Sequence, residues 1–524
     1  MYVNLDSKKT NFVVVGGGTA GWITALLMRH LYPSINITLI ESQEIGILGA
    51  GEGTVPQFVD VLEVLGISVS DLINHADATI KSGIKLVNWN GRGKNDIIFS
   101  NFVDSPLTDY VDMTRIQFSQ IAMVILERIS QGETVDDVVF NAKVCNANKV
   151  KFKFNKTDRL RDPVYHFNKL GSISVHFNAA KLANYLKTVG VTRNIKLVDG
   201  IIEKINEDKN GYITSFTLKD GTEVPSDFVF DCSGFHRLII GKHYKCKWNS
   251  FKDYLPVNKA VPFFLPIDEN KPIPPYTEAI AMKYGWMWKI PVRGRYGCGY
   301  VFDDRLIDAE QAKQEIREEV GNVDMPRVIG FEPGYYDTPW IKNCIAIGLS
   351  SGFVEPLEAT SVHIAVITAS LFTTYNNGAV LRCEKTISRF NKIMQEYNND
   401  VLNYLQFHYL GKRTDTVFWK DFTKRNKLTP LIEKIIQGGK DPMHLLERDL
   451  ITSSLYPLNL ILELCTGLRF FDKEIAADHF RALYTGSRKA KYDYAISNLK
   501  EIQDKTVNSL IDHKDFLDYI LKNK

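Results

Sequence analysis

The chain has 524 residues, of which 44% are hydrophobic and 24% are charged. This length exceeds a single compact core and suits two or three units, and the ordinary composition excludes a disordered or fibrous protein. Lys and Arg number 64 against 61 Asp and Glu, so the chain offers no general excess of charge for binding nucleic acid.

The N-terminal residues and the cysteines predict a cytoplasmic protein. Residues 1–12 contain no long apolar stretch, so no signal peptide is expected. No run of about 18 apolar residues follows, so no membrane span is expected. The seven cysteines are scattered and lack C-x-x-C spacing. This pattern favours a reducing compartment and argues against disulfides and a structural metal site.

The first predicted element is a strand that ends in a glycine turn and leads into a helix, NFVVVGGGTAGW at residues 11–22. Its glycines have the G-x-G-x-x-G spacing, which allows a sharp turn, a close approach of backbone N–H groups to a pyrophosphate, and tight packing of helix on strand. A second strand, NITLIE, ends in an acid where dinucleotide folds bind ribose hydroxyls. A turn that binds nothing is the alternative, and the ordered set of strand, glycines, helix and acid argues against it. The residues expected at the nucleotide are Gly16, Gly18, Thr19, Ala20, Gly21 and Glu41.

A glycine-rich loop (44–56) and two helices come next, followed by Lys81 in IKSGIK. Residues 95–170 resemble an insertion. Its basic stretch, 149–161, interleaves lysines with phenylalanines, as a nucleic-acid platform can. We favour a half-buried strand with Lys149, Lys151 and Lys153 facing solvent and Val150, Phe152 and Phe154 facing the core.

The remaining elements complete an α/β fold. A helix is expected after His176, a β-meander over 196–234, and a larger antiparallel sheet over 258–302. The buried strand CIAIGLSSGF precedes a helix from about Ser361, and helices dominate from 390 with a break at KLTPL. The fingerprint at the start, the meander ending in DCSG and the late apolar strand ending in a glycine turn together resemble the FAD-binding fold of flavin monooxygenases. This resemblance implies a Rossmann-like three-layer FAD/NAD(P)-binding fold in residues 1–390. A mainly helical substrate-side subdomain is predicted for 391–524.

Several motifs together carry a family resemblance. They are GGGTAGW, the segment with Lys81, DCSGF (231–235), GWMWKIPV (285–292), SSGFVEPLEATS (350–361) and FHYLGKRTDTVFW (407–419). Over roughly residues 10–420 the chain resembles flavin-dependent halogenases of the tryptophan halogenase family, for which W-x-W-x-I-P is quite specific. No second G-x-G-x-x-G is present for a nicotinamide nucleotide.

The resemblance implies a reaction in which reduced FAD and oxygen convert a halide into hypohalous acid. This oxidant passes through a tunnel to Lys81, and Glu358 polarises it and accepts the proton that the aromatic ring loses. It also implies a separate flavin reductase, and a homo-oligomer is compatible with the sequence. The family positions for the flavin are Gly49, Ala50, Gly51, Gly348 and Pro356, those for the halide are Thr360 and Ser361, and those walling the flavin pocket are Trp286 and Trp288.

Each of these residues has a plainer interpretation. Lys81 could be an exposed turn lysine, since most lysines are exposed. Glu358 could be a charge favoured by the start of the following helix. Trp286 and Trp288 alternate on a strand and could be ordinary core packing. Many family members have glycine at the position of Ser361, which leaves the halide preference open.

Substrate recognition departs from tryptophan-specific members. After the strand IIF the chain reads SNFVDS, without the histidine and proline common there, and the tyrosine pair before a G-L turn becomes Ile461 and Leu462. An apolar wall cannot satisfy a buried ammonium or carboxylate, so a less polar, electron-rich aromatic is expected in place of free tryptophan. A flavin-dependent aromatic hydroxylase and a non-catalytic flavin-binding protein are the alternatives, and a nicotinamide dehydrogenase would leave W-x-W-x-I-P unexplained.

Overall fold

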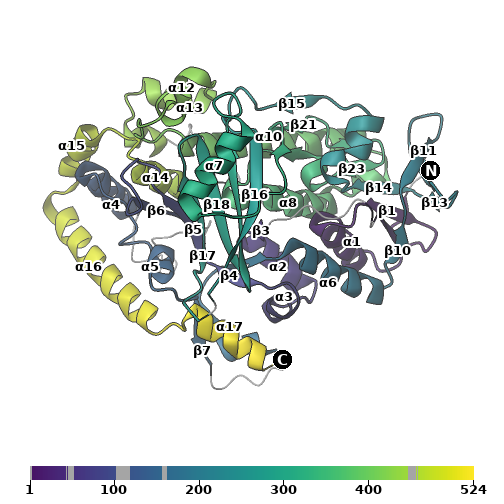
Figure 1. Ribbon diagram of the computed structural model, residues 1–524, viewed down its shortest axis with the longest axis horizontal. Helices are drawn as coiled ribbons and strands as arrows, with labels where there is room; N and C mark the ends of the chain where they lie inside the picture. The colour runs from purple at the N-terminus through teal and green to yellow at the C-terminus, as the bar shows by residue number, and fades with distance from the viewer. Residues whose placement is uncertain are drawn as a thin grey trace. The chain divides into compact units, whose positions relative to one another are not determined.

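The computed structural model describes residues 3–42, 44, 52–101, 118–155, 162–268, 270–446, 456 and 458–523. The chain folds into two compact units, each assembled from three separated stretches (Figure 1). Unit 1 comprises Met1–Asp77, Phe177–Phe251 and Glu332–Asn398, and unit 2 comprises Ala78–His176, Lys252–Phe331 and Asn399–Lys524.

Unit 1 is built on a six-stranded sheet with the strand order β10-β2-β1-β14-β23-β22. The first five strands run parallel, and β22 pairs antiparallel with β23 at one edge. This is the expected Rossmann-like arrangement, entered through the apolar strand NFVVV. The strands are β1 (Asn11–Val15), β2 (Asn36–Glu41), β10 (Lys196–Asp199), β14 (Phe228–Asp231), β22 (Trp340–Ile341) and β23 (Cys344–Ala346).

The two faces of this sheet are covered by different layers. Val13 and Val229 point into a buried cluster with Phe216 of the predicted meander. On the opposite face Phe12 packs within 6.3 Å of Phe372, between ring centroids. The alternation along β1 thus separates a meander layer from a helix layer, which confirms the three-layer α/β fold. The covering elements are β11 (Ile202–Glu207), β12 (Ile213–Leu218) and β13 (Glu223–Pro225) on one side, and α1 (Thr19–Leu31), α6 (Ala179–Thr192) and α8 (Thr360–Tyr375) on the other.

Local sequence explains where the helices of unit 1 begin. α6 starts after Asn178, whose side chain accepts a hydrogen bond from the backbone N–H of Lys181, so the helix expected after His176 begins three residues later. α3 (Val69–His75) has a capping box in which Ser68 and Asp71 bond each other's backbone N–H groups. The other helices and strands that lie wholly in unit 1 are α2 (Pro56–Val64), α9 (Asn377–Val380), β3 (Glu52–Gly53), β15 (Trp248–Ser250), β21 (Gly334–Tyr336) and β24 (Gly352–Phe353).

One helical stretch is long and apolar enough to cross a membrane by length and composition, although the sequence predicts no membrane span. Among the described residues, Leu357–Tyr375 passes that test by length and composition, and about half of it is buried. Much of this stretch is α8, whose buried residues include Phe372 on the sheet. A buried core helix passes the same test, so the stretch is weak support for a membrane span.

Unit 2 is built on a seven-stranded sheet with the order β20-β16-β19-β18-β17-β5-β6. The strands predicted over 258–302 form its antiparallel centre, and β5 joins in parallel with β17. Met287, Tyr300 and Ile316 share a buried cluster between this sheet and α7 (Ala309–Val320). The strands are β5 (Gly83–Val87), β6 (Ile97–Ser100), β16 (Lys259–Pro266), β17 (Tyr276–Ala281), β18 (Gly285–Val292), β19 (Arg295–Phe302) and β20 (Ile329–Gly330).

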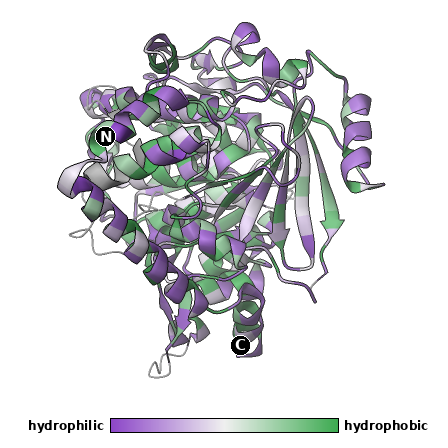
Figure 2. Cartoon of the chain, turned by 90° about the vertical axis from the view of Figure 1, so that its left-hand side faces the viewer, coloured by the Kyte–Doolittle hydropathy of each residue, from purple (hydrophilic) through white to green (hydrophobic). Residues whose placement is uncertain are grey.

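The described part of the C-terminal region is helical, as expected. The last helix, α17, carries hydrophilic and hydrophobic residues along its length (Figure 2), and it buries Phe516, Leu517 and Ile520. Besides α7, the helices of unit 2 are α4 (Phe118–Gln131), α5 (Phe140–Asn146), the end of α10 (Glu384–His408), α11 (Val417–Lys420), α12 (Phe422–Arg425), α13 (Pro430–Gln437), α14 (Leu458–Gly467), α15 (Lys473–Leu483), α16 (Gly486–Asn508) and α17 (His513–Lys522).

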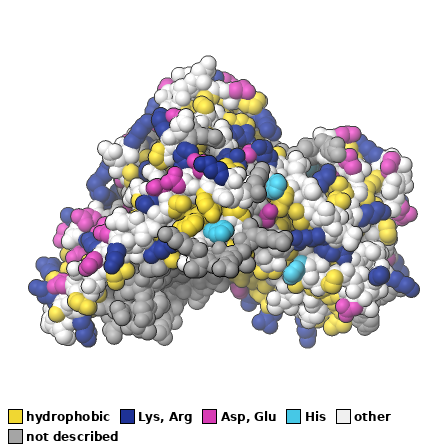
Figure 3. All heavy atoms as spheres, turned by 90° about the horizontal axis from the view of Figure 1, so that it is seen from below, with side chains coloured by type: hydrophobic (Ala, Val, Ile, Leu, Met, Phe, Trp, Pro, Cys, Tyr) yellow, Lys and Arg dark blue, Asp and Glu magenta, His cyan; other side chains and the backbone are white. Residues whose placement is uncertain are grey.

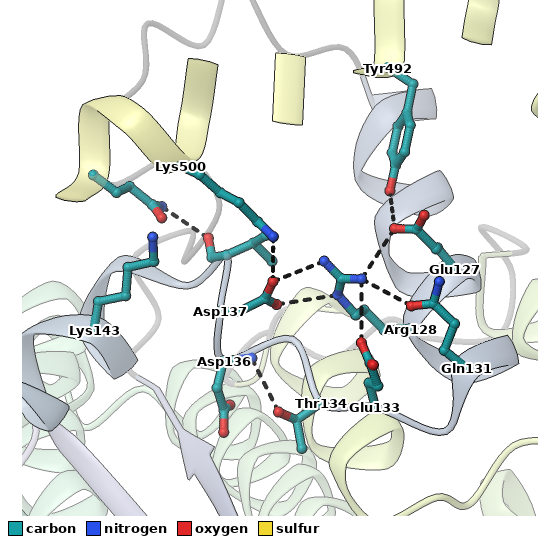
Figure 4. A network of polar contacts seen from close by, with 12 residues as sticks. Glu127, Arg128, Gln131, Glu133, Thr134, Asp136, Asp137, Lys143, Tyr492 and Lys500 are labelled. Carbon is teal, nitrogen blue, oxygen red and sulfur yellow. Dashed lines mark hydrogen bonds and ion pairs between the residues drawn. The ribbon is translucent and has the colours of Figure 1, made fainter. Parts of the chain in front are cut away.

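A polar network joins α4 to α16 within unit 2 (Figure 4). The buried guanidinium of Arg128 donates to both carboxylate oxygens of Asp137 at 3.2 and 2.9 Å and to Glu127 at 3.3 Å. From α16, Tyr492 donates to Glu127 at 2.6 Å, and Lys500 pairs with Asp137 at 2.7 Å. These bonds satisfy a guanidinium that would otherwise be costly to bury.

The basic stretch near residue 150 does not alternate as predicted. Lys151 is fully buried and Phe154 is half exposed, the reverse of what we expected for both. The strand β7 begins only at Phe152 and pairs with β8 (Phe167–Lys169). Ahead of it the backbone of Val150 bonds to Ile511 near α17, so the regular alternation of a strand does not apply there.

Figure 3 shows basic and acidic side chains interspersed on one face of the molecule.

Candidate functional site

The glycine turn of unit 1 lies at the carboxyl ends of its parallel strands. Gly16 has φ of +118°, and a Cβ there would overlap the carbonyl of Cys232 after β14. A Cβ on Gly21 would overlap the carbonyl of Gly16. Gly18, in contrast, has no atom within 4 Å of its virtual Cβ. Two glycines thus permit close packing and the third faces open space at the start of α1, as a pyrophosphate site requires.

The acid predicted for the ribose lies on the same turn. Glu41 ends β2, and a Cβ on Gly17 would overlap its carboxylate. Its other carboxylate oxygen forms an ion pair with Lys187 of α6. Lys187 was not expected from the sequence, because a single lysine on an amphipathic helix carries no motif.

Two motifs far apart in the sequence meet beside this turn. Phe235 of DCSGF contacts Phe353 of SSGFVEP edge to face, with ring centroids 5.1 Å apart. Gly348 has φ of +69°, and its virtual Cβ lies 3.1 Å from the side chain of Ala20. The fully buried Asp231 accepts hydrogen bonds from the backbone N–H groups of Ile239 and Ile240 at 2.9 and 3.0 Å. The flavin residues Gly49, Ala50 and Gly51 lie outside the described residues.

The segment that precedes α8 is strained. Pro356 begins a single helical turn, and Glu358 and Ala359 follow with φ of +64° and +54°. The left-handed conformation is costly for residues other than glycine and persists where the surroundings enforce it, often at functional sites. Thr360 is buried and Ser361 half-buried at the first turn of α8. Burial lowers the pKa of the nearby His363 to about 4, so that imidazole adds no positive charge at neutral pH.

In unit 2, Lys81 is buried, with 1% of its surface exposed. It ends the three-residue strand β4 (Thr79–Lys81), which pairs antiparallel with β9 (Ser174–Phe177). The interpretation of Lys81 as an exposed turn lysine is therefore wrong. A buried lysine needs specific partners for its ammonium and is uncommon without a structural or functional reason.

Two neutral histidines lie close to this strand. The backbone N–H of Ile80 donates to Nε2 of His513 at 2.9 Å, and Nδ1 of His513 donates to the carbonyl of Ile273 at 2.9 Å. His513 is therefore neutral, and burial lowers its pKa to about 4. Burial, and then the charge of Lys81, holds the pKa of His176 well below its usual value. Neither histidine was anticipated, because each stands alone in its segment.

Trp286 and Trp288 share one face of β18, with ring centroids 6.3 Å apart. The Met287 side packs under α7, so alternation places the two indoles on the opposite face of the sheet. Trp288 lies over Gly299 of β19, where a Cβ would overlap its ring. Both side chains are buried, which is also consistent with packing alone.

Comparison with known proteins identifies this architecture. The family model described as tryptophan halogenase matches residues 11–448. The chain belongs to the tryptophan halogenase family. This halogenase is 30% identical to the tryptophan 6-halogenase ThaL of Streptomyces albogriseolus over 438 residues, 79% of each chain. It is 25% identical to BrvH, a flavin-dependent halogenase from Brevundimonas sp. BAL3, with a TM-score of 0.80 over 97% of this chain and 99% of that one.

The fold is also shared with the tryptophan halogenase from Shewanella frigidimarina, at a TM-score of 0.85 and 24% identity over 98% of each chain. Family membership makes the protein a flavin-dependent halogenase, and identities near 30% leave its substrate open.

The helix predicted to face the substrate is less apolar than its sequence indicated. Ile461 and Leu462 of α14 are buried, as expected, but Glu463 beside them is also buried, with 4% of its surface exposed. Asn101 donates to its carboxylate at 3.3 Å. The pairing of Ile84 with Ser100 puts Asn101 opposite Gly83, two residues from Lys81. A lone acid within the apolar run LNLILELCTG was the signal in the sequence.

Flavin affinity tests the glycine turn of the halogenase. Gly18→Ala is expected to raise the Kd for FAD by at least about tenfold, because the new Cβ occupies the space through which the backbone approaches a pyrophosphate. Its free energy of unfolding should change by less than about 0.5 kcal/mol, since no atom lies within 4 Å. Gly16→Ala is the contrasting variant and should lose both stability and FAD. Wild-type FAD affinity in Gly18→Ala would contradict this placement.

Proposed function

We propose that this enzyme halogenates an electron-rich aromatic that is less polar than free tryptophan, using reduced FAD, oxygen and a halide ion. The observation that carries the proposal is Lys81, a family-position lysine that is buried on β4 with its charge felt by a neutral histidine. When bound, the reduced flavin would give two electrons to oxygen, and the oxidant so formed would take two electrons from the halide to give hypohalous acid.

In unit 1 the chain binds the cofactor and the halide. The turn residues Gly16 and Gly18, with the start of α1 at Thr19, hold the pyrophosphate through backbone N–H groups. Glu41 holds the ribose. The N–H groups that begin α8 at Thr360 and Ser361 hold the halide. The further flavin contacts that we propose are Ala20, Gly21, Gly49, Ala50, Gly51, Gly348 and Pro356.

A second set of residues directs the oxidant to the aromatic ring. The amine of Lys81 hydrogen-bonds the hypohalous acid or forms a haloamine with it, and little water is present to screen its charge. Glu358 accepts the proton that the ring loses after substitution. Trp286 and Trp288 exclude bulky organic molecules from the flavin. A hydroxylase would instead need its substrate beside the flavin and would leave Lys81 without a role.

The residues of α14 support this class of substrate. Ile461 and Leu462 favour an apolar ring system, such as an indole, phenol or aniline. Glu463 beside them carries a carboxylate that accepts a hydrogen bond from Asn101. This carboxylate would repel a carboxylate on the substrate, and it favours a substrate that brings a hydrogen-bond donor. We propose that a separate flavin reductase delivers the reduced flavin. The seven free cysteines support a cytoplasmic location.

A product screen tests this function. The full-length enzyme receives reduced FAD from a flavin reductase, a mixed panel of indoles, phenols, anilines and free tryptophan, and chloride, bromide or iodide in separate reactions. We expect mass shifts that follow the halide offered, on the neutral aromatics and not on free tryptophan. An added oxygen atom with every halide would establish a hydroxylase, and halogenated tryptophan would refute the substrate assignment.

A further inference from the structure

We propose that Thr79, His176 and Thr277 are positioning residues for Lys81. They form an oriented chain of side-chain hydrogen bonds that fastens β4 to β18, the strand of the W-x-W-x-I-P motif. The inference rests on the role of Lys81 proposed above, and it assigns a further function to the carbonyl of Pro291 in that motif.

The direction of each bond in the chain can be assigned. The Thr79 hydroxyl donates to the carbonyl of Pro291 at 2.6 Å, which uses its only hydrogen. Nδ1 of His176, 3.0 Å from the same hydroxyl, must then donate to it. Nε2 of His176 is left to accept from the hydroxyl of Thr277 at 2.9 Å. The chain therefore runs from β17 through β9 and β4 to β18 with the imidazole neutral.

The strand that carries Lys81 needs such support because it is very short. β4 has three residues and pairs with β9 along one edge, with Thr79 opposite His176 and Lys81 opposite Ser174. Its other edge presents the N–H of Ile80, which is bound by His513 from α17. A pairing of only three residues holds a strand weakly by itself. The Thr79 bond to Pro291 adds a side-chain link to the large sheet of unit 2, beside the bond from the backbone N–H of Ser82 to the carbonyl of Pro275.

The bond from Thr79 to Pro291 fixes the backbone of the strand from which the Lys81 side chain extends. Thr79 and Lys81 are two residues apart on an extended strand, so their side chains leave the same face. The lysine stem has four flexible carbons, and the position of its amine is only as well defined as the backbone beneath it. A displacement of about 1 Å at a reacting group can cost about 100-fold in rate. Thr79, His176 and Thr277 are all buried, so water cannot replace a lost bond easily.

The test compares Thr79→Val, which removes the hydroxyl and keeps the shape, with Thr79→Ser, which restores it. Thr368→Val is the matched control, because Thr368 is an equally buried threonine whose hydroxyl bonds a carbonyl of its own helix. For each full-length variant, the halogenated product formed per reduced FAD consumed is measured, and escaped hypohalous acid is collected with a thioether scavenger. The substrate is the best aromatic from the product screen, with bromide.

Thr79→Val is expected to lower the product per flavin by about tenfold or more, with a matching rise in scavenged oxidant and unchanged flavin consumption. Thr79→Ser should recover most of the product, and Thr368→Val should match wild type. If Thr79→Val fails to fold, Thr277→Val replaces it, because this variant interrupts the chain one bond further from the lysine. Thr277→Val is expected to lower the product per flavin by about threefold or more, again with a matching rise in scavenged oxidant.

The inference would be overturned if folded Thr79→Val divided its oxidant between product and scavenger as wild type does. It would also be overturned if Thr79→Val and Thr368→Val lost product per flavin equally. A separate arm identifies a failure of the proposed function itself. If Lys81→Met keeps full halogenation, the assigned role of Lys81 falls whatever Thr79 does. If Lys81→Met abolishes halogenation, adding Thr79→Val to it should change the partition no further, because the two residues act through one amine.

Discussion

Lys81→Ala is expected to lower halogenation by at least about 10³-fold while oxidation of reduced flavin by oxygen continues. Lys81 as a whole is 1% exposed, and a charge in such surroundings interacts far more strongly than in water. Without it, hypohalous acid has no group to hold it near the aromatic ring and escapes. Product by mass spectrometry, flavin consumption by absorbance and escaped oxidant by scavenging measure the three quantities in one reaction.

Two further lysine variants make this result specific. Lys85→Ala lies four residues along the chain and removes a lysine that pairs with Glu278 at 3.8 Å, so it should halogenate as wild type does. Lys81→Arg keeps the charge with a different donor geometry and a bulkier head group, and it should recover little activity. Full product from Lys81→Ala would remove this residue from the mechanism.

Glu358→Gln is expected to slow halogenation by about 100-fold, the usual range for loss of a general base. The amide keeps the size of the side chain and cannot take the proton that the ring releases. The rate of product formation in a single turnover, measured with reduced FAD in excess, reports this step. An unchanged rate would show that another group accepts the proton.

The backbone of Glu358 offers a second variant that separates chemistry from folding. With φ of +64° at this residue, Glu358→Gly relieves strain of about 1 kcal/mol or more and should raise the free energy of unfolding. Its halogenation should nevertheless fall as far as that of Glu358→Gln. A stabilised enzyme with lost activity would tie the carboxylate to the reaction, whereas retained activity in Glu358→Gly would contradict its role.

The nucleotide-binding fold was predictable because its signals are local. The strand, three glycines, helix and acid of residues 11–41 all lie in one continuous segment, and the structure places the glycine turn at the carboxyl ends of parallel strands. The meander and the antiparallel sheet were likewise readable from alternation and turn residues. The prediction failed at Lys151, because the backbone on either side of it bonds to Ile511 ahead of the regular strand. It also failed at Phe154, which ends β7 with its side chain half exposed.

The surroundings of Lys81 were not predictable. His176 and His513 are separated from it by long stretches of chain, and each is a single histidine in an apolar or helical context. The bond between Asn101 and Glu463 was not predictable either, because a lone acid in an apolar run does not indicate which residue will bind it. Such polar pairs depend on which segments pack together.

The amino-acid sequence alone determined the family, the fold class and the identity of the residues that we assign to flavin, halide and oxidant. These depend on short motifs whose geometry follows from nearby residues. The tertiary structure decided that Lys81 is buried, that its neighbouring histidines are neutral, and that Thr79 ties its strand to Pro291. Burial and hydrogen bonding are set by contacts between distant segments, and no local pattern encodes them.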